Sequence, residues 1–207
     1  MHDDNSKLKE ISKNIYDVSA EMERRFGTVG TPQREKATEE GWSEYQDFCK
    51  ACKSKAVILY ILKKCKEKQS IDILSKKLFI IQRTYLVKYG RGILYESFHA
   101  YKEYPYPSLL LCLKKQVKGN DATKFFNEDP DMDELAQAEI EIIDDELNKL
   151  NKLTEEELNN LIFQDHAFKC YFNNLKCGEV ISILKIAESG GATKGILEYI
   201  QETNITF

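Results

Sequence analysis

The stretch that decides the fold is Leu74–Pro107, which reads LSKKLFIIQRTYLVKYGRGILYESFHAYKEYPYP. It mixes lysine and arginine with closely spaced tyrosines and phenylalanines. We expect short helices over 71–79, 82–89 and 93–104, the second closed by Gly90 and Gly92 and the third ended by Pro105 and Pro107. Such a stretch is expected to present cations and flat aromatic rings to a charged partner.

Apolar residues recur at helical spacing through the rest of the chain. A helix over 43–68 is expected to be central, with Trp42 and Tyr45 on its buried face and Gly41 ending the short helix before it. Four prolines and ten glycines are too few for a β-sandwich. We therefore predict an all-α, multi-helix bundle. The remaining predicted helices cover 3–26, 32–40, 108–118, 132–153, 154–173, 179–189 and 193–202.

Composition places the chain among intracellular proteins. Its N-terminus is polar where a signal peptide would be apolar, and the longest apolar run, Ala56 to Leu62, is far shorter than the roughly 20 residues that span a bilayer. We expect a cytoplasmic protein with no membrane contact. The six cysteines are then expected to be reduced thiols.

Charge is divided unevenly along the chain. Residues 50–118 hold 16 Lys and Arg against 4 Asp and Glu, a net of +12, whereas residues 121–165 hold 3 against 15, a net of −12. We predict a basic helical domain over 1–118, a linker over 119–131 and an acidic helical region over 132–207, either separate or packed together as one domain. The asymmetry indicates an anionic partner, an internal neutralising contact, or both.

Two segments resemble parts of bacterial regulators. Leu74, Ser75 and Leu78, followed by an expected turn and a second helix, resemble the helix-turn-helix of phage-repressor-like and antitoxin regulators, although Phe79 stands where that family has glycine. The resemblance implies that the second helix enters the major groove. Residues 25–34 are similar to a leader that precedes the DNA-binding part of some antitoxin-type regulators.

The leading hypothesis is therefore a non-enzymatic nucleic-acid-binding or regulatory protein, with DNA or RNA as the partner. Cations would hold phosphates, and tyrosines would stack on unpaired bases unless their rings pack into the core. The acidic region would compete for the same surface. The predicted nucleic-acid-binding residues are Lys76, Lys77, Gln82, Arg83, Tyr85, Lys88, Arg91 and Lys102.

The alternative hypothesis is a helical interaction or adaptor protein, for example a mobile-element or viral antagonist of host machinery. It would bind another protein through its acidic face and an apolar seam at heptad-like spacing. If the basic residues do not converge on one surface, this hypothesis is favoured. The predicted partner-binding residues of the seam are Ile140, Ile143, Leu147 and Leu150.

Catalytic and metal sites have little support. Cys49-x-x-Cys52 lacks a second pair at zinc spacing, and His166 with Cys170 offers only two ligands. We therefore predict no metal and no cofactor. An all-α nuclease is the third hypothesis, which would need His99 or His166 to face a concave pocket beside a charged partner.

Overall fold

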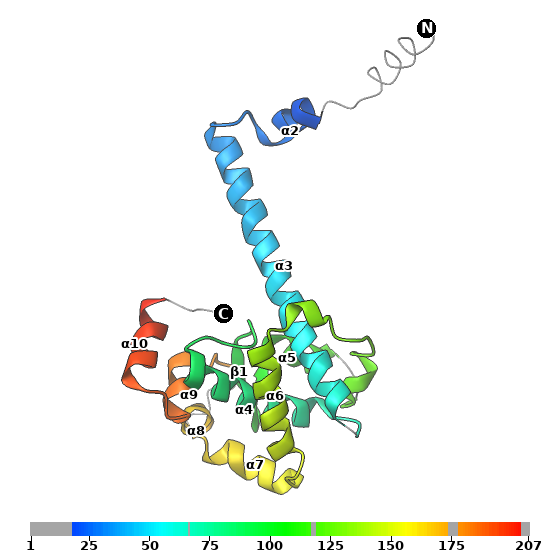
Figure 1. Cartoon of the computed structure of the whole chain (residues 1–207), viewed down its shortest axis with the longest axis vertical. Coiled ribbons are helices and arrows are strands. Elements are labelled where there is room, and N and C mark those ends of the chain that lie inside the picture. The colour runs from blue at the N-terminus through cyan, green and yellow to red at the C-terminus, as the bar shows by residue number, and fades with distance from the viewer. Residues whose placement is uncertain (1–17, 66, 117–118, 174–177, 204–207) are drawn as a thin grey trace, which may run out of the picture. The chain divides into compact units, whose positions relative to one another are not determined.

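The computed structural model describes residues 18–65, 67–116, 119–173 and 178–203 (Figure 1). Nine α-helices and one two-stranded hairpin lie in these ranges, so the prediction of a predominantly all-α fold is confirmed. Contacts divide the chain between Cys49 and Lys50 into two compact units. The domain division predicted around 119–131 stays a prediction.

The first unit contains α2 (Val18–Phe26) and the first half of α3 (Pro32–Lys64). Thr31 begins α3 as expected, because its Oγ1 accepts a hydrogen bond from the backbone N of Arg34 at 3.4 Å. The predicted break at Gly41 is wrong, since α3 continues through it. One glycine inside a helix costs only about 1 kcal/mol, which a helix of 33 residues can absorb. Residues 3–17 of the first predicted helix lie outside the described residues.

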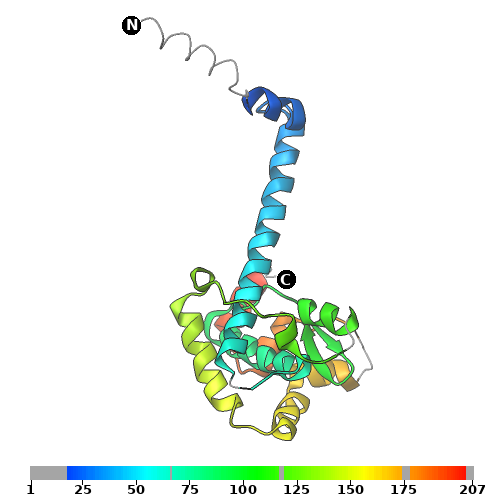
Figure 2. The same cartoon turned by 90° about the vertical axis from the view of Figure 1, so that its right-hand side faces the viewer.

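The second unit is organised around α4 (Ile71–Tyr89). Ser70 caps its start by accepting a hydrogen bond from Ile73 N at 3.1 Å, and Gly90 ends it with a left-handed φ of 68°. Twelve of its 19 residues are buried, which is typical of a helix that is covered on all sides. Five other helices and the hairpin pack against it. Figure 2 shows the same arrangement from the side.

The two short helices predicted over 71–79 and 82–89 are one continuous helix. The expected turn at Phe79 is absent because no glycine or proline interrupts the run. The Phe79 ring is fully buried and meets the Phe98 ring edge-on at a centroid distance of 5.4 Å. The turn of the resembled helix-turn-helix is therefore missing at this position.

The helix predicted over 93–104 is wrong, because an antiparallel hairpin of β1 (Phe98–Tyr101) and β2 (Tyr104–Pro107) stands there. Lys102, in the turn, has a left-handed φ of 52°. Aromatic residues favour strands, and proline withholds the N–H that a helix needs. Tertiary contacts complete the hairpin: Ile181 N donates to the carbonyl O of Phe98 at 2.7 Å on the free edge of β1.

The remaining helices complete the cover around α4. The capping box predicted at Thr154 and Glu157 is present, and Asp165 separates the two helices of the segment predicted as 154–173. No helix within the described ranges is long and apolar enough to cross a membrane. These helices are α5 (Ser108–Gln116), α6 (Gln137–Leu150), α7 (Glu155–Gln164), α8 (His166–Asn173), α9 (Ile183–Ser189) and α10 (Lys194–Glu202), with 3₁₀ turns at Ala122–Lys124 and Met132–Glu134.

Candidate partner-binding surfaces

Four of the eight residues predicted to bind nucleic acid are buried in the second unit: Lys76, Lys77, Gln82 and Tyr85. Gln82 Oε1 accepts hydrogen bonds from the backbone N of residues 93 and 94, both at 2.9 Å. This amide therefore fixes the loop that follows α4. A phosphate or base cannot reach these side chains without opening the core around them.

The two buried lysines are satisfied from within the chain. Lys76 Nζ donates to Asn159 Oδ1 at 2.5 Å and lies 3.9 Å from the ring centroid of Tyr104. Burial lowers the pKa of Lys76, although the nearby Glu155 carboxylate acts in the opposite direction. Lys77 Nζ donates to side-chain oxygens of Gln69 and Asn151 at 2.7 and 2.8 Å. Both ammonium groups are thus held by partners within the second unit.

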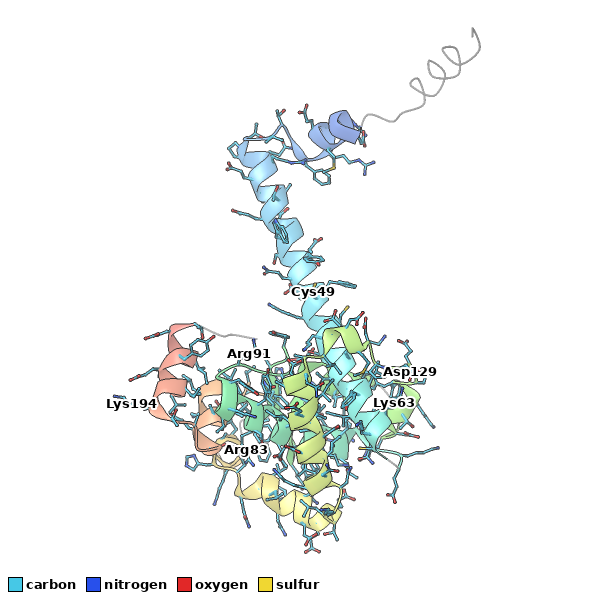
Figure 3. All side chains as sticks on the ribbon, in the orientation of Figure 1. Cys49, Lys63, Arg83, Arg91, Asp129 and Lys194 are labelled. Atoms are coloured by element: carbon cyan, nitrogen blue, oxygen red, sulfur yellow. The ribbon has the colours of Figure 1, made fainter. Side chains whose placement is uncertain are left out.

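Arg83 holds α4 to the helices that follow α7. Its Nη1 donates to Asp165 Oδ2, and the Asp165 side chain is fully buried. The other oxygen of Asp165 accepts from the backbone N of Ala167 and Phe168 at 2.9 and 3.2 Å, which caps α8. Ser189 Oγ donates to Oδ2 at 3.1 Å. Figure 3 shows Arg83 among these helices.

The other three predicted residues, Lys88, Arg91 and Lys102, are exposed. Each lies near a tyrosine ring, at 5.2 to 6.0 Å from the ring centroid. Arg91 Nη2 also donates to the hydroxyl of Tyr85 at 3.3 Å. They come from three different places: the last turn of α4, the loop after it and the hairpin turn. Whether they bind nucleic acid stays a prediction.

Much of the basic block faces the acidic block directly. Of the 14 cations of 50–118 that the structure describes, six have a carboxylate from 121–165 within 4.0 Å (Figure 3 labels Lys63 and Asp129). This is the internal neutralising contact that the charge asymmetry left open. The six pairs are Lys53–Glu139, Lys55–Glu128, Lys63–Asp129, Lys64–Asp144, Lys76–Glu155 and Arg83–Asp165.

The seam predicted to bind a partner lies inside the second unit. Ile143, Leu147 and Leu150 are no more than 4% exposed, and Ile140 is half-buried against the same core. The helix that carries them, α6, packs on α4. The seam therefore supplies the core of this chain, and an outside helix cannot reach three of its four residues as they stand.

The two histidines among the described residues, His99 and His166, have partners within the chain. The two ring nitrogens of His99 each lie 3.1 Å from an oxygen, the carbonyl of Gly178 and the hydroxyl of Ser108. His166 Nδ1 lies 3.9 Å from Cys170 Sγ. His99 and His166 line neither the groove at residues 22–45 nor the cavity between Lys64 and Leu158. Within the described ranges, no three His, Cys, Asp or Glu side chains gather as metal ligands would.

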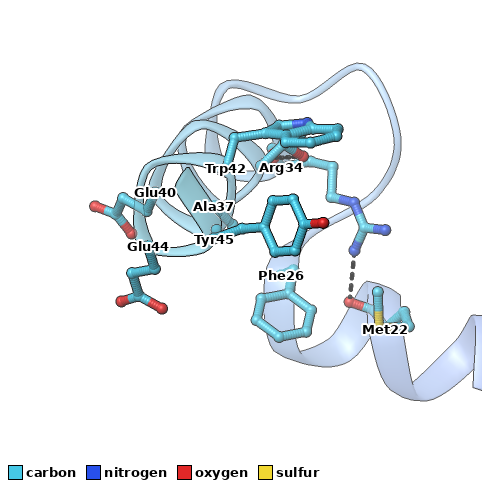
Figure 4. Close-up of a pocket in the computed structure, with 10 residues that line it drawn as sticks. Met22, Phe26, Arg34, Ala37, Glu40, Trp42, Glu44 and Tyr45 are labelled. Carbon is cyan, nitrogen blue, oxygen red and sulfur yellow. Dashed lines mark hydrogen bonds between the residues drawn. The ribbon is translucent and has the colours of Figure 1, made fainter. Parts of the chain in front are cut away.

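The first unit carries an apolar groove that the sequence did not predict. It has a volume of about 650 Å³ and lies between α2 and the first half of α3. Figure 4 shows Phe26, Tyr45 and Trp42 along one side, and the guanidinium of Arg34 donating to the carbonyl O of Met22, at 3.3 Å. The prediction that Trp42 and Tyr45 face the core is wrong, since they are 61% and 59% exposed.

A sequence signal for this groove exists. Residues 37–48 hold four carboxylates and no lysine or arginine, yet they also hold three aromatic residues. A helix segment with so many charged residues is seldom covered on all sides, so its aromatic residues are poor candidates for a buried core. The prediction of a buried face rested on the helical spacing of the aromatic residues alone. That spacing is the same whether the rings face the core or the solvent.

Comparison with known families gives one match. Residues 74–168 match the model of the family described as "Antitoxin SocA-like, Panacea domain". That range begins within α4 and ends within α8, so it contains the hairpin, α6 and α7. This part of the chain is similar to a regulatory antitoxin domain. No curated protein and no solved structure matches the chain.

Proposed function

We propose that this protein is an antitoxin-like regulator that acts by binding another protein, its cognate toxin. The observation that carries the proposal is the family match across the centre of the second unit, from α4 to α8. An antitoxin is defined by what it neutralises, and direct binding of the toxin is the simplest route.

The charge arrangement supports a protein partner over a nucleic acid. Six cations of the basic block face carboxylates of the acidic block, and the side chains of Lys53, Lys76 and Arg83 are at most 23% exposed, so a phosphate backbone would have to compete with internal carboxylates. Four of the eight predicted nucleic-acid-binding residues are buried as well. The three predicted cations that are exposed, Lys88, Arg91 and Lys102, come from separate elements. Basic residues that do not converge on one surface favour the adaptor hypothesis.

The direct test is growth rescue. The full chain is expressed in a bacterial host together with the toxin encoded beside its gene, and colony counts are compared with and without the chain. Rescue together with co-purification of the two proteins is the expected result. If the toxin kills the host equally well in both strains while the chain is well expressed, the proposal is wrong.

Nucleic-acid binding is the second candidate. The observation that favours it is that Lys88, Arg91 and Lys102 stay exposed beside tyrosine rings, as in sites that hold both phosphates and bases. Fluorescence anisotropy with a labelled duplex and a labelled single strand at increasing salt tests it. The full chain must be used, because a chain ending near residue 119 would lose α6 and α7, which complete the core around α4.

A further inference from the structure

We infer that the groove between α2 and α3 binds a cationic amphipathic helix of a partner protein. The groove is the patch defined by Met22, Phe26, Trp42 and Tyr45, with Glu40 and Glu44 beside them. The inference deepens the proposed function, because it assigns a docking surface and a chemistry to the partner. It uses only residues of the first unit.

The first observation is exposure. Six of the eleven large apolar side chains that are exposed in the described part of the chain lie between residues 22 and 48. No side chain described between residues 21 and 49 is buried. Soluble proteins seldom leave contiguous apolar patches in water, and where they do the patch commonly marks an interaction site. The six residues are Met22, Phe26, Val29, Trp42, Tyr45 and Phe48.

The second observation is the shape of the patch. The groove of about 650 Å³ is lined by residues of both α2 and α3, and the Trp42 and Tyr45 rings meet edge-on at a centroid distance of 6.0 Å. Figure 4 shows these rings and the Phe26 ring facing the same space. A groove with rigid aromatic walls suits the apolar face of a single helix, which inserts side chains at i, i+3 and i+4 spacing.

The third observation is charge, which selects the occupant. Glu40 and Glu44 line the groove, and the segment 37–48 contains four carboxylates without a lysine or arginine. Among the described residues that line the groove, the one cation is Arg34, which already lies over the Phe26 ring and donates to Met22 O. A second copy that docked its own 37–48 segment here would bring carboxylates against carboxylates, whereas a lysine- and arginine-rich helix would find opposite charge.

The chain offers a reporter at the site itself. Trp42 is its one tryptophan, so emission excited selectively from tryptophan comes from the groove. A helix that fills the groove removes water from the 61% exposed indole and should shift its emission to shorter wavelength. The signal separates binding at the groove from binding elsewhere on the chain.

The probe is a synthetic amphipathic peptide of about four helical turns, with leucines on one face and lysines on the other. A peptide with glutamates in place of the lysines has the same apolar face and is the matched control. We expect the lysine peptide to shift the Trp42 emission saturably and the glutamate peptide to bind at least about tenfold more weakly. Raising the salt should weaken the lysine peptide because the carboxylates are exposed.

Two variants of the full chain locate the site. Glu40→Lys with Glu44→Lys reverses the charge beside the groove and should weaken the lysine peptide about tenfold. Glu188→Lys with Glu202→Lys makes the same change of charge at exposed positions of the second unit and should leave binding unchanged. If the two variants bind the lysine peptide with equal affinity, or if the peptide binds without shifting the Trp42 emission, the inference is wrong.

Two further outcomes separate the inference from the proposed function. If sedimentation shows a dimer of the free chain that Phe26→Ser converts to a monomer, the occupant is a second copy and the inference is wrong. In the growth-rescue assay, rescue by the wild type but not by the Glu40→Lys, Glu44→Lys variant supports both proposals. Equal rescue by the two overturns the groove as the toxin's dock and leaves the antitoxin function standing.

Discussion

Replacing Arg83 by methionine should destabilise the second unit by about 3 kcal/mol. The change keeps an apolar side chain of similar length but removes the guanidinium that faces the fully buried Asp165 carboxylate. Loss of one partner of a buried ion pair costs about 3–5 kcal/mol. The low end applies here, because 23% of the Arg83 side chain is exposed and three other donors stay on the carboxylate.

Urea unfolding followed by far-UV circular dichroism measures this loss. For a unit of this size about 3 kcal/mol corresponds to a fall in Tm of roughly 6–12 °C. Lys194→Met is the control, because it breaks the Lys194–Glu198 pair, whose side chains are 90% and 54% exposed; its unfolding midpoint should match the wild type. If Arg83→Met costs no more than this control, the account of Asp165 as a buried charge that depends on Arg83 is refuted.

Three other perturbations test the packing and the buried charges. Gly190→Ala should destabilise by about 1–3 kcal/mol, since its new Cβ would lie 2.5 Å from Val87 Cγ2, whereas Gly195→Ala, with open space around it, should be neutral or slightly stabilising in thermal melts. Burial acts to raise the pKa of Asp72, but hydrogen bonds from a lysine, a tyrosine and an asparagine outweigh burial and lower it. The stability that this carboxylate contributes is therefore complete above about pH 4 and is lost as the pH falls through the lowered pKa, and Asp72→Asn should flatten this part of an acid titration of unfolding. Because burial lowers the pKa of Lys76, the unfolded chain holds its proton to higher pH than the folded one. Stability should then rise toward about pH 10, and Lys76→Met should remove that rise in urea midpoints measured at several pH values.

The helix ends were predictable where a local signal sets them. Ser70, Thr154 and Gly90 act through hydrogen bonds or dihedral angles within a few residues of themselves, so the sequence alone reveals them. The hairpin could not be predicted from such local signals, because the free edge of β1 is completed by residues near 181, far along the chain. The spacing of apolar residues indicates which face of a helix is buried, and it carries no information about a distant segment that pairs with a strand.

The candidate sites were predictable only in part. The two charge blocks indicated an anionic partner, an internal contact or both, and the ion pairs between the blocks show the internal contact. The burial of Lys76 and Lys77 could not be predicted. The sequence of an apolar helix does not indicate whether its lysine side chains extend into water or donate to a side-chain amide elsewhere in the chain. The groove beside Trp42 was hidden for the converse reason, since an exposed aromatic residue has the same spacing as a buried one.

The five hydrogen-bonded ion pairs between the blocks join residues that lie 66 to 86 positions apart. A ribosome adds about 5–20 residues per second, so each of these cations is synthesised roughly 3–17 s before its acidic partner. Over that interval the nascent chain is a polycation beside ribosomal RNA. Translation speed through the acidic block then sets how long the newborn chain stays exposed to that competitor, and slow codons there should reduce the yield of folded protein without changing its sequence.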